Sequence, residues 1–190
     1  EEIGRVSSCL SIERDFLVAA LDEEERSRLE IEDGHTLILV DTPTVETQGP
    51  NFVYNTLPFG IILTEDNIVT VCLKEVALPR AFTEGLVRGL NTRKKNRMTL
   101  QFLYRNATLF LFYLRQVDKS STRVENELHI SMKNKELIQM LGLEKSLVYF
   151  STALKSNEIG LEKMLRLDFV KDYPEDTELL EDVIVENTFL

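Results

Sequence analysis

The sequence is poor in the residues that build metal centres and disulfide frameworks. It has no tryptophan, two histidines and two cysteines among 190 residues. Cys9 and Cys72 are too few for a disulfide framework. Neither His35 nor His129 has a second histidine or a cysteine at zinc-ligand spacing. Cys72 is expected to pack in its apolar run as a small hydrophobic residue, and the low cysteine content favours a reducing, cytosolic environment.

Catalytic sequence motifs are also missing. The chain has no Walker loop, no G-x-G-x-x-G stretch and no G-x-S-x-G elbow. The sequence offers no credible pair of a histidine and a nucleophile, so it contains no candidate residues for nucleophilic catalysis. Carboxylates are abundant, but acid–base catalysis needs one in an apolar pocket, which a sequence does not reveal. We therefore expect a binding, regulatory or assembly protein that is not an enzyme and requires no cofactor.

Positive charge and long apolar runs are scarce as well. The chain has 22 Lys and Arg against 32 Asp and Glu, a formal net charge of −10. This balance argues against nucleic acid as a partner, because phosphate binding needs a basic surface. The most apolar stretch, 107–114, is bracketed by Arg105 and Arg115. A bilayer-spanning helix needs about 20 residues, so we expect no membrane span and no signal peptide in this sequence.

What the chain does contain begins with the pattern of a small sheet. Thr36–Val40 is apolar and β-branched, which predicts a buried strand. Pro43 is expected to end it, because proline cannot donate to a central ladder. A turn is expected at 48–51, where glycine and proline adjoin. Residues 56–63 and 68–73 are apolar runs on either side of a short polar turn, and they predict an antiparallel hairpin.

Two short helices are expected before this sheet. Helical spacing of apolar residues predicts one over 1–10 and another over 12–20. The strongly charged run 26–33 is interpreted as a solvated segment and not as a metal cluster.

Further helices are expected after the sheet. Apolar spacing predicts helices at 82–90 and 98–117, joined by a basic link at 91–97. The four cations of this link could hold an anion, but a solvated loop is the favoured interpretation in an acidic protein. A helical hairpin is expected at about 123–167, with its break near Gly142. The order of elements is typical of an α+β fold.

The last segment, 174–190, begins as a helix and shows no stop signal. Pro174 suits a first helical turn, and acidic residues follow it at the positive end of the helix dipole. Leu180, Val183, Asn187 and Leu190 have the 4-3-4-3 spacing of a helix that packs along another helix. We therefore expect the sequence to be a fragment of a longer protein.

Several phrases of the sequence resemble the N-terminal cytoplasmic domain of CorA-type magnesium transporters. The first part of the resemblance lies in DFLVAALDEEERSRLEIEDGHTLILVDTP and LPFGIILTEDNIVTVC. The later stretches SLVYFSTALKSNEIGLEKML and DTELLEDVIVEN are similar to the helical hairpin of that family and to the start of its long stalk helix. The resemblance covers nearly the whole chain.

This resemblance implies a fold and a place in the cell. The fold would be an α/β/α sandwich, with a small mixed sheet containing an antiparallel hairpin between layers of helices. Residues 1–172 would form the cytoplasmic domain, and 174–190 would begin the stalk. Members of the family are homopentamers whose stalk continues into the membrane, where a Gly-Met-Asn motif selects the hydrated ion. The chain has no such motif. It would be the regulatory domain without the pore, at the cytoplasmic face of the cell membrane, with its own subunits and divalent cations as partners.

The resemblance also implies a regulatory Mg²⁺ site between subunits, built from carboxylates. The acidic pair that the family carries on its second short helix aligns with Val18 and Ala19, which cannot bind a metal. Asp22 and Glu23 lie about one turn further on and are the candidate substitutes. The partner carboxylate on the stalk would fall beyond Leu190.

Two other functions fit the sequence. A zinc-transporting member of the same superfamily is one, because ion selectivity would reside in the pore. The other is a soluble helical scaffold whose C-terminal helix forms a coiled coil with a partner protein. A single buried Asn187 would set the register of such a coiled coil.

Overall fold

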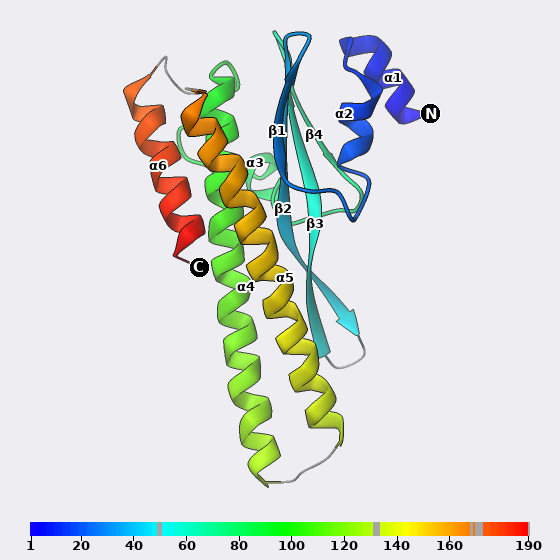
Figure 1. Cartoon of the computed structure of the whole chain (residues 1–190), viewed down its shortest axis with the longest axis vertical. Helices are drawn as coiled ribbons and strands as arrows, with labels where there is room; N and C mark the ends of the chain where they lie inside the picture. Colours follow the sequence, from blue (N-terminus) through cyan, green and yellow to red (C-terminus); the bar gives the residue numbers. More distant parts are fainter. Residues whose placement is uncertain (49–50, 131–133, 168, 170–172, 190) are drawn as a thin grey trace.

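The computed structural model describes residues 1–48, 51–130, 134–167, 169 and 173–189. The elements in chain order are α1 (Glu2–Leu10), α2 (Arg14–Ala19), β1 (Arg28–Glu32), β2 (His35–Gln48), β3 (Asn51–Leu63), β4 (Ile68–Cys72), α3 (Arg80–Thr83), α4 (Lys95–Ile130), α5 (Asn134–Arg166) and α6 (Pro174–Thr188). The two short N-terminal helices cover one face of the sheet, and the α4–α5 hairpin covers the other (Figure 1). This layering confirms the predicted α+β sandwich.

The sheet is a four-stranded meander. Its order is β1-β2-β3-β4, and each of the three described pairings is antiparallel. The expected mixed sheet is therefore wrong. Antiparallel neighbours can be joined by short turns, whereas a parallel pair would need a long crossover connection. The predicted hairpin of β3 and β4 is confirmed. The predicted turn at 48–51 includes residues 49–50, which lie outside the described residues.

The β2–β3 ribbon is much longer than the sequence indicated. β2 does not end at Pro43, which pairs with Thr56 in a register that runs on to Gln48 and Asn51. The reason lies at the edge of the strand. The pairing of β1 with β2 stops at Leu39, so β2 has an open edge from Asp41 onward, and the N–H of Asp41 points towards this edge. Backbone N–H groups of alternate residues point to the same side of a strand, so the nitrogen of Pro43 also faces the open edge. Proline therefore removes no ladder bond there.

The charged run predicted to be solvated forms the edge strand β1. Its sequence alternates charged and apolar side chains, so that Leu29 enters the core while the charged residues remain accessible. Asp33 and Gly34 both have positive φ, 47° and 79°, and make the tight turn into β2. The Asp-Gly pair between alternating residues was the signal for this hairpin.

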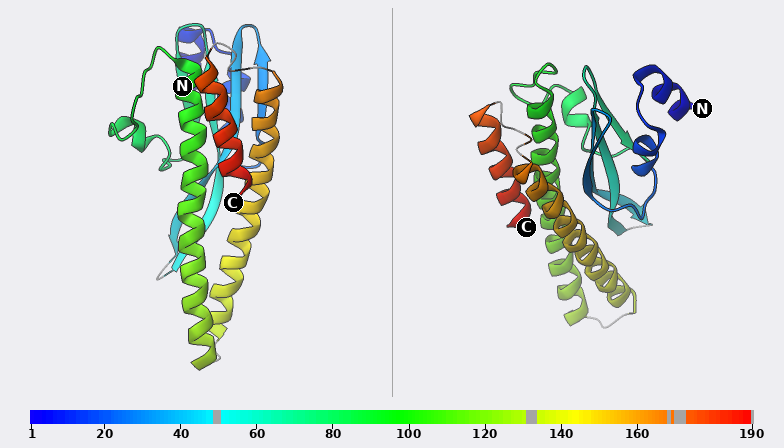
Figure 2. Two further views of the ribbon diagram at one scale, coloured as in Figure 1. Left: turned by 90° about the vertical axis from the view of Figure 1, so that its left-hand side faces the viewer. Right: turned by 45° about the horizontal axis from the view of Figure 1, so that its top comes forward.

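The helices also differ from their predicted bounds. The helix expected at 82–90 is a single turn, α3, because Gly85 and Gly89 adopt positive φ, which helical residues do not. The hairpin is formed by the full lengths of α4 and α5 and not by 123–167 (Figure 2). α5 runs through Gly142 without a break, since an isolated glycine lowers helix stability but does not stop the helix.

Two core layers lie on either side of the sheet. Alternating residues of β2 divide between them: Ile38 and Val40 pack towards α3–α6, and Leu37 and Leu39 pack towards α1 and α2. A third cluster fills the space between the hairpin and the far end of the ribbon around Tyr54. Burial of these apolar surfaces supplies the main stabilisation of the layers.

α6 packs along both helices of the hairpin, and its buried residues include Leu180, Val183 and Asn187. The predicted seam is confirmed at these three positions, while Leu190 lies outside the described residues. Pro174 occupies the first turn, as predicted. No helix within the described residues is long and apolar enough to cross a membrane.

Candidate functional site

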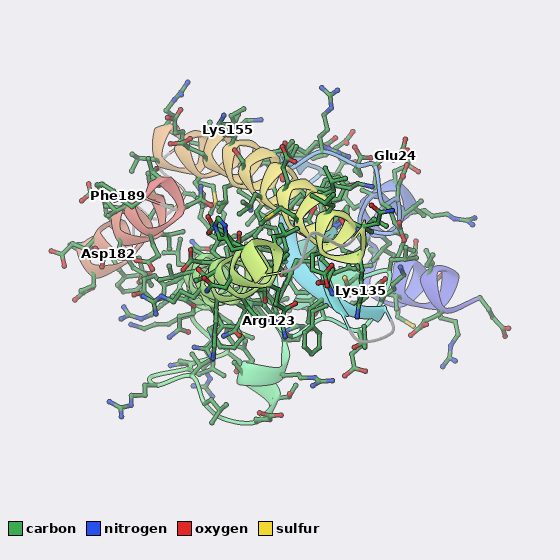
Figure 3. The ribbon with its side chains drawn as sticks, turned by 90° about the horizontal axis from the view of Figure 1, so that it is seen from below. Glu24, Arg123, Lys135, Lys155, Asp182 and Phe189 are labelled. Atoms are coloured by element: carbon green, nitrogen blue, oxygen red, sulfur yellow. The ribbon has the colours of Figure 1, made fainter. Side chains whose placement is uncertain are left out.

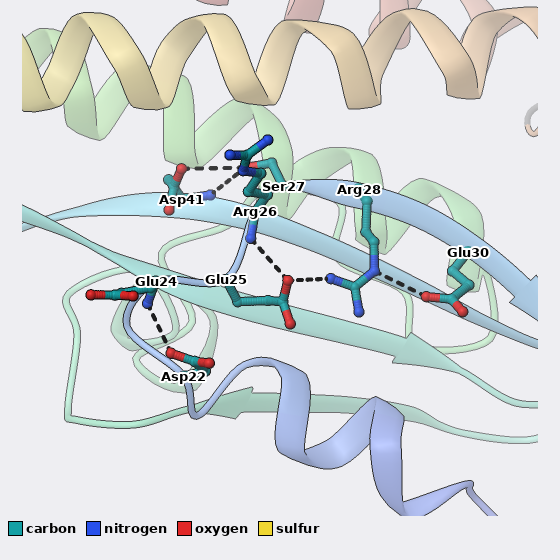
Figure 4. Close-up of polar contacts among 8 residues, drawn as sticks. All are labelled: Asp22, Glu24, Glu25, Arg26, Ser27, Arg28, Glu30 and Asp41. Carbon is teal, nitrogen blue, oxygen red and sulfur yellow. Dashed lines mark hydrogen bonds and ion pairs between the residues drawn. The ribbon is translucent and has the colours of Figure 1, made fainter.

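The two predicted metal ligands follow α2 in the link to β1. Asp22 Oδ1 accepts the backbone N–H of Glu24 at 3.0 Å and closes a local turn (Figure 4). Glu23 Oε1 lies 3.2 Å from Nζ of Lys74, which follows β4. Both carboxylates remain at the surface, so they have protein partners but are not enclosed.

The neighbouring charges of this link form ion pairs along the sheet edge. Glu25 Oε1 accepts the backbone N–H of Arg26 and lies 2.8 Å from Nη1 of Arg28. Nε of Arg28 in turn lies 3.0 Å from Oε2 of Glu30 (Figure 4). Within the part of the chain that the structure describes, no group of three or more His, Cys, Asp or Glu is placed to hold a metal ion.

The positions that align with the acidic pair of the family differ in their surroundings. The side chain of Val18 is 40% exposed, whereas Ala19 is 7% exposed and packs in the core layer between α2 and the sheet. The role of Asp22 and Glu23 as Mg²⁺ ligands therefore stays a prediction. A site shared between subunits would complete its ligand set from a second copy, and Mg²⁺ keeps several waters, so two carboxylates from one chain are a workable contribution.

α6 concentrates negative charge at the surface. Residues 174–190 contain no Lys or Arg, and Glu175, Glu178, Glu181 and Asp182 are all exposed. Polar contacts near both ends hold the helix, and they include a hydrogen bond from the hydroxyl of Thr188 to Oε1 of Glu158 at 2.9 Å. Asp176 turns inward and its Oδ1 lies 3.0 Å from Nη1 of Arg97, while Asn187 Nδ2 donates to the carbonyl oxygen of Leu154 at 2.9 Å. Buried polar contacts of this kind fix the register of one helix on another.

The basic segment predicted as a link at 91–97 includes the first residues of α4, and its cations contact other elements. Lys95 donates through Nζ to the backbone carbonyls of Thr64 and Glu65. The ammonium of Lys94 lies 4.6 Å from the ring centre of Tyr173, a cation–π contact. With Arg97 paired to α6, three of the cations of this link have protein partners.

A buried polar cluster that the sequence did not predict centres on Asp41. The amide of Asn157 on α5 accepts the Asp41 N–H at 2.8 Å and donates to the Asp41 carbonyl at 2.9 Å. It thereby takes the place of a strand residue before Arg28, where β1 begins. Asn106 of α4 donates to the same carbonyl at 2.8 Å. The signal in the sequence was an asparagine at a buried position of the apolar pattern 150-154-157-161.

The side chain of Asp41 is largely buried. Removal from water raises its pKa to about 6, and the hydroxyl of Ser27, 3.3 Å from Oδ2, opposes this by a hydrogen bond to the carboxylate. Oδ1 of Asn157 lies 2.8 Å from the same hydroxyl and shares its one hydrogen with the carboxylate. The cluster thus connects the link before β1, the strand β2 and both helices of the hairpin.

The chain shares its fold with solved structures of other proteins. The structure titled the soluble domain of CorA from Methanocaldococcus jannaschii superposes with a TM-score of 0.87 at 22% identity, covering 99% of this chain and 75% of that one. The complete CorA magnesium transporter of the same organism gives 0.86 at 20% identity, with 99% and 59% covered. The ZntB cytoplasmic domain from Vibrio parahaemolyticus RIMD 2210633 gives 0.66 at 9% identity, with 99% and 80% covered.

The sequence agrees with this fold. The family described as CorA-like Mg²⁺ transporter protein matches residues 1–190. The chain belongs to the CorA-like Mg²⁺ transporter family. A curated relative, the cobalt/magnesium transport protein CorA of Methanocaldococcus jannaschii, is 25% identical over 196 residues, which cover 96% of this chain. The chain spans 57% of the length of that relative.

Proposed function

We propose that this chain is the cytoplasmic regulatory domain of a CorA-type magnesium transporter, at the cytoplasmic face of the cell membrane, and that it has no enzymatic activity. The observation that carries the proposal is the match of the CorA-like family over residues 1–190. The fold supports it, because all three layers and α6 are shared with the soluble domain of CorA. The full-length protein would act as an assembly of several copies, and a pentamer is our expectation.

The regulatory part of the proposal depends on carboxylates that meet a cation. Mg²⁺ takes oxygen ligands, and its charge offsets repulsion between facing acidic surfaces. A cation of this kind would favour a closely packed assembly over a loose one, which is a population shift between two states. Asp22 and Glu23 are the proposed ligands on this chain, and no other cofactor is proposed.

A Mg²⁺ titration tests the proposed ligands. Thermal unfolding of the chain is followed with increasing MgCl₂ for the parent and for Asp22→Ala/Glu23→Ala. We expect the midpoint of the parent to rise with Mg²⁺ and that of the variant to rise less, since a ligand that binds only the folded state stabilises it. Glu125→Ala/Glu127→Ala, which removes two exposed acids of α4, is the matched control and should respond like the parent. Equal responses of all three would remove Asp22 and Glu23 from the proposal.

Zinc is the alternative ion. The resemblance to the ZntB domain, which covers 99% of this chain, is the observation that supports this alternative. Vesicles containing the full-length protein distinguish the two ions by uptake of Mg²⁺ against uptake of Zn²⁺. The scaffold alternative is less well supported, because the seam of Leu180, Val183 and Asn187 already packs on the chain's own hairpin. A coiled coil through that seam would first have to displace α6 from α4 and α5.

A further inference from the structure

A groove lies where the far end of the β2–β3 ribbon meets α4. It has a volume of about 560 Å³, and its lining includes Val45, Phe52, Phe112, Tyr113, Lys119 and Arg123. The side chains of Phe52 and Phe112 are 60% and 54% exposed, which is high for large aromatic residues. None of the described residues that line the groove is acidic. We call this surface the ribbon groove; it is apolar with a basic rim.

The outer face of α6 has the opposite charge and a similar apolar part. Its exposed residues repeat at the 3-4-3-4 spacing of one helix face: Glu175, Glu178, Asp182, Val185 and Phe189. The side chain of Phe189 is 86% exposed and that of Val185 is 50% exposed. No cation lies on this helix to balance the carboxylates. We call this surface the acidic face.

The two surfaces cannot meet within one molecule. Asp182 and Phe189 point outward from α6 on one side of the molecule, whereas Arg123 projects from α4 elsewhere (Figure 3). α6 is fixed in this position by the contacts of Asp176 with Arg97 and of Asn187 with Leu154. The acidic face therefore remains accessible to another molecule.

We propose that the ribbon groove of one copy of this chain receives the acidic face of α6 from a second copy. The carboxylates of Glu178 and Asp182 would face the cations of Lys119 and Arg123, and Val185 and Phe189 would pack against Phe52 and Phe112. An apolar helix face laid into a groove with a charged rim is a common mode of recognition. The contact joins two different surfaces, so each copy keeps one free groove and one free helix, and repetition closes a ring or extends a chain. The inference deepens the proposed assembly of several copies by naming the surfaces that meet.

Charge reversal in two variants tests this contact. The groove variant is Lys119→Glu/Arg123→Glu, and the helix variant is Glu178→Lys/Asp182→Lys. Sedimentation equilibrium of the chain at low salt, with EDTA present, measures self-association. Each variant alone should associate at least about tenfold more weakly than the parent, because like charges would face each other. An equimolar mixture of the two variants should associate again, since an acidic groove then meets a basic helix. Added salt should weaken the association of the parent.

The control reverses two exposed cations of α5, Lys135→Glu/Lys155→Glu, and should leave the association unchanged. A parent chain that stays monomeric at millimolar concentration would overturn the proposal. So would a mixture that associates no better than either variant. If the helix variant loses only Mg²⁺ binding, with no change in self-association, the acidic face serves a divalent cation and the proposal is wrong. Because the measurement uses the chain without metal, its outcome is independent of whether the full-length protein transports Mg²⁺.

Discussion

At the scale of single residues, Asp41 is a point where distant parts of the chain meet. Its backbone is bonded to Asn157 and Asn106, which lie 116 and 65 positions away in the sequence. β1 does not pair with β2 at this position, and the asparagine side chains bond the N–H and the carbonyl oxygen of Asp41 instead. The backbone polar groups of Asp41 therefore both have partners. The position of the hairpin against the sheet is therefore specified by hydrogen bonds as well as by apolar packing.

The carboxyl group of Asp41 makes the stability of the fold depend on pH. Burial raises its pKa to about 6, so the folded chain holds the proton more tightly than the unfolded chain. A group of this kind stabilises the fold below its unfolded pKa, and the contribution is lost as the pH rises through 6. We expect the free energy of unfolding of the parent to fall by up to about 3 kcal/mol between pH 4 and pH 7. This fall should be absent in Asp41→Asn, which has no carboxyl group to titrate at this position. Urea denaturation across this range measures the difference.

Asp66→Asn is the matched control, because Asp66 is exposed. It should keep the pH dependence of the parent. The same slope for all three proteins would mean that Asp41 is not the titrating group.

At this scale the sequence could predict buried residues but not their partners. Helical spacing located Leu180, Val183 and Asn187 correctly, because burial on one face of a helix has a local period. The contact of Asn157 with Asp41 has no local period. It depends on the point at which β1 begins, and no residue pattern near Asn157 contains that information.

At the scale of elements, Gly60 determines how closely α2 can approach β3. A Cβ added at Gly60 would lie 2.9 Å from Cβ of Ala20, which is too close for two carbon atoms. Gly142 in the middle of α5 has open space at the same position. The close packing at Gly60 therefore requires the absence of a side chain, whereas the surroundings of Gly142 do not.

The same substitution should have opposite effects at these two positions. Gly60→Ala should lower the free energy of unfolding by about 1–3 kcal/mol, because the sheet and α2 would be forced apart. Gly142→Ala should raise it by about 0.5–1 kcal/mol, because alanine loses less backbone entropy in a helix. Chemical denaturation of both variants against the parent decides this. A destabilised Gly142→Ala would show that the glycine has a packing role that its open surroundings do not suggest.

Element types were more predictable than element bounds. The strands and the long helices could be recognised from their periods, but Pro43 and Gly142 were both given too much weight as stop signals. Proline interrupts a strand only where a ladder bond is needed, and β2 has an open edge at that point. Whether an edge is open is a property of the whole sheet.

At the scale of the whole molecule, one of the contacts that join α6 to the rest of the fold is the ion pair of Arg97 with the buried carboxylate of Asp176. Arg97→Ala would leave the carboxylate of Asp176 buried without its cation. Breaking a buried pair by removing one partner is costly, and we expect a loss of about 2–4 kcal/mol in the free energy of unfolding. Hydrogen exchange should show the loss first as faster exchange of the α6 amides, with those of α4 less affected.

The double variant Arg97→Met/Asp176→Leu distinguishes charge from packing. It replaces the pair by apolar side chains and should recover most of the stability that Arg97→Ala loses. If both variants exchange equally fast in α6, the ion pair does not hold the helix. The division of the chain into a domain at 1–172 and a stalk from 174 remains a prediction that this experiment addresses.

The layered fold as a whole could be predicted from the sequence, because the order of the elements and the resemblance to the CorA-type domain both indicate it. The candidate metal site was less accessible. Asp22 and Glu23 were chosen by their distance along the chain, whereas the ion pair of Glu23 with Lys74 depends on how β4 returns to the link after α2.

The hydrogen bonds of Asn106 and Asn157 to the backbone of Asp41 have a mechanical consequence. They attach the hairpin to the sheet about a third of the way along α4, and α4 continues from Asn106 for roughly 36 Å to Ile130. The hairpin can be regarded as a lever whose fulcrum is the carbonyl oxygen of Asp41. A push on its far end would be felt on the other side of that fulcrum, where Arg97 holds Asp176 of the helix α6.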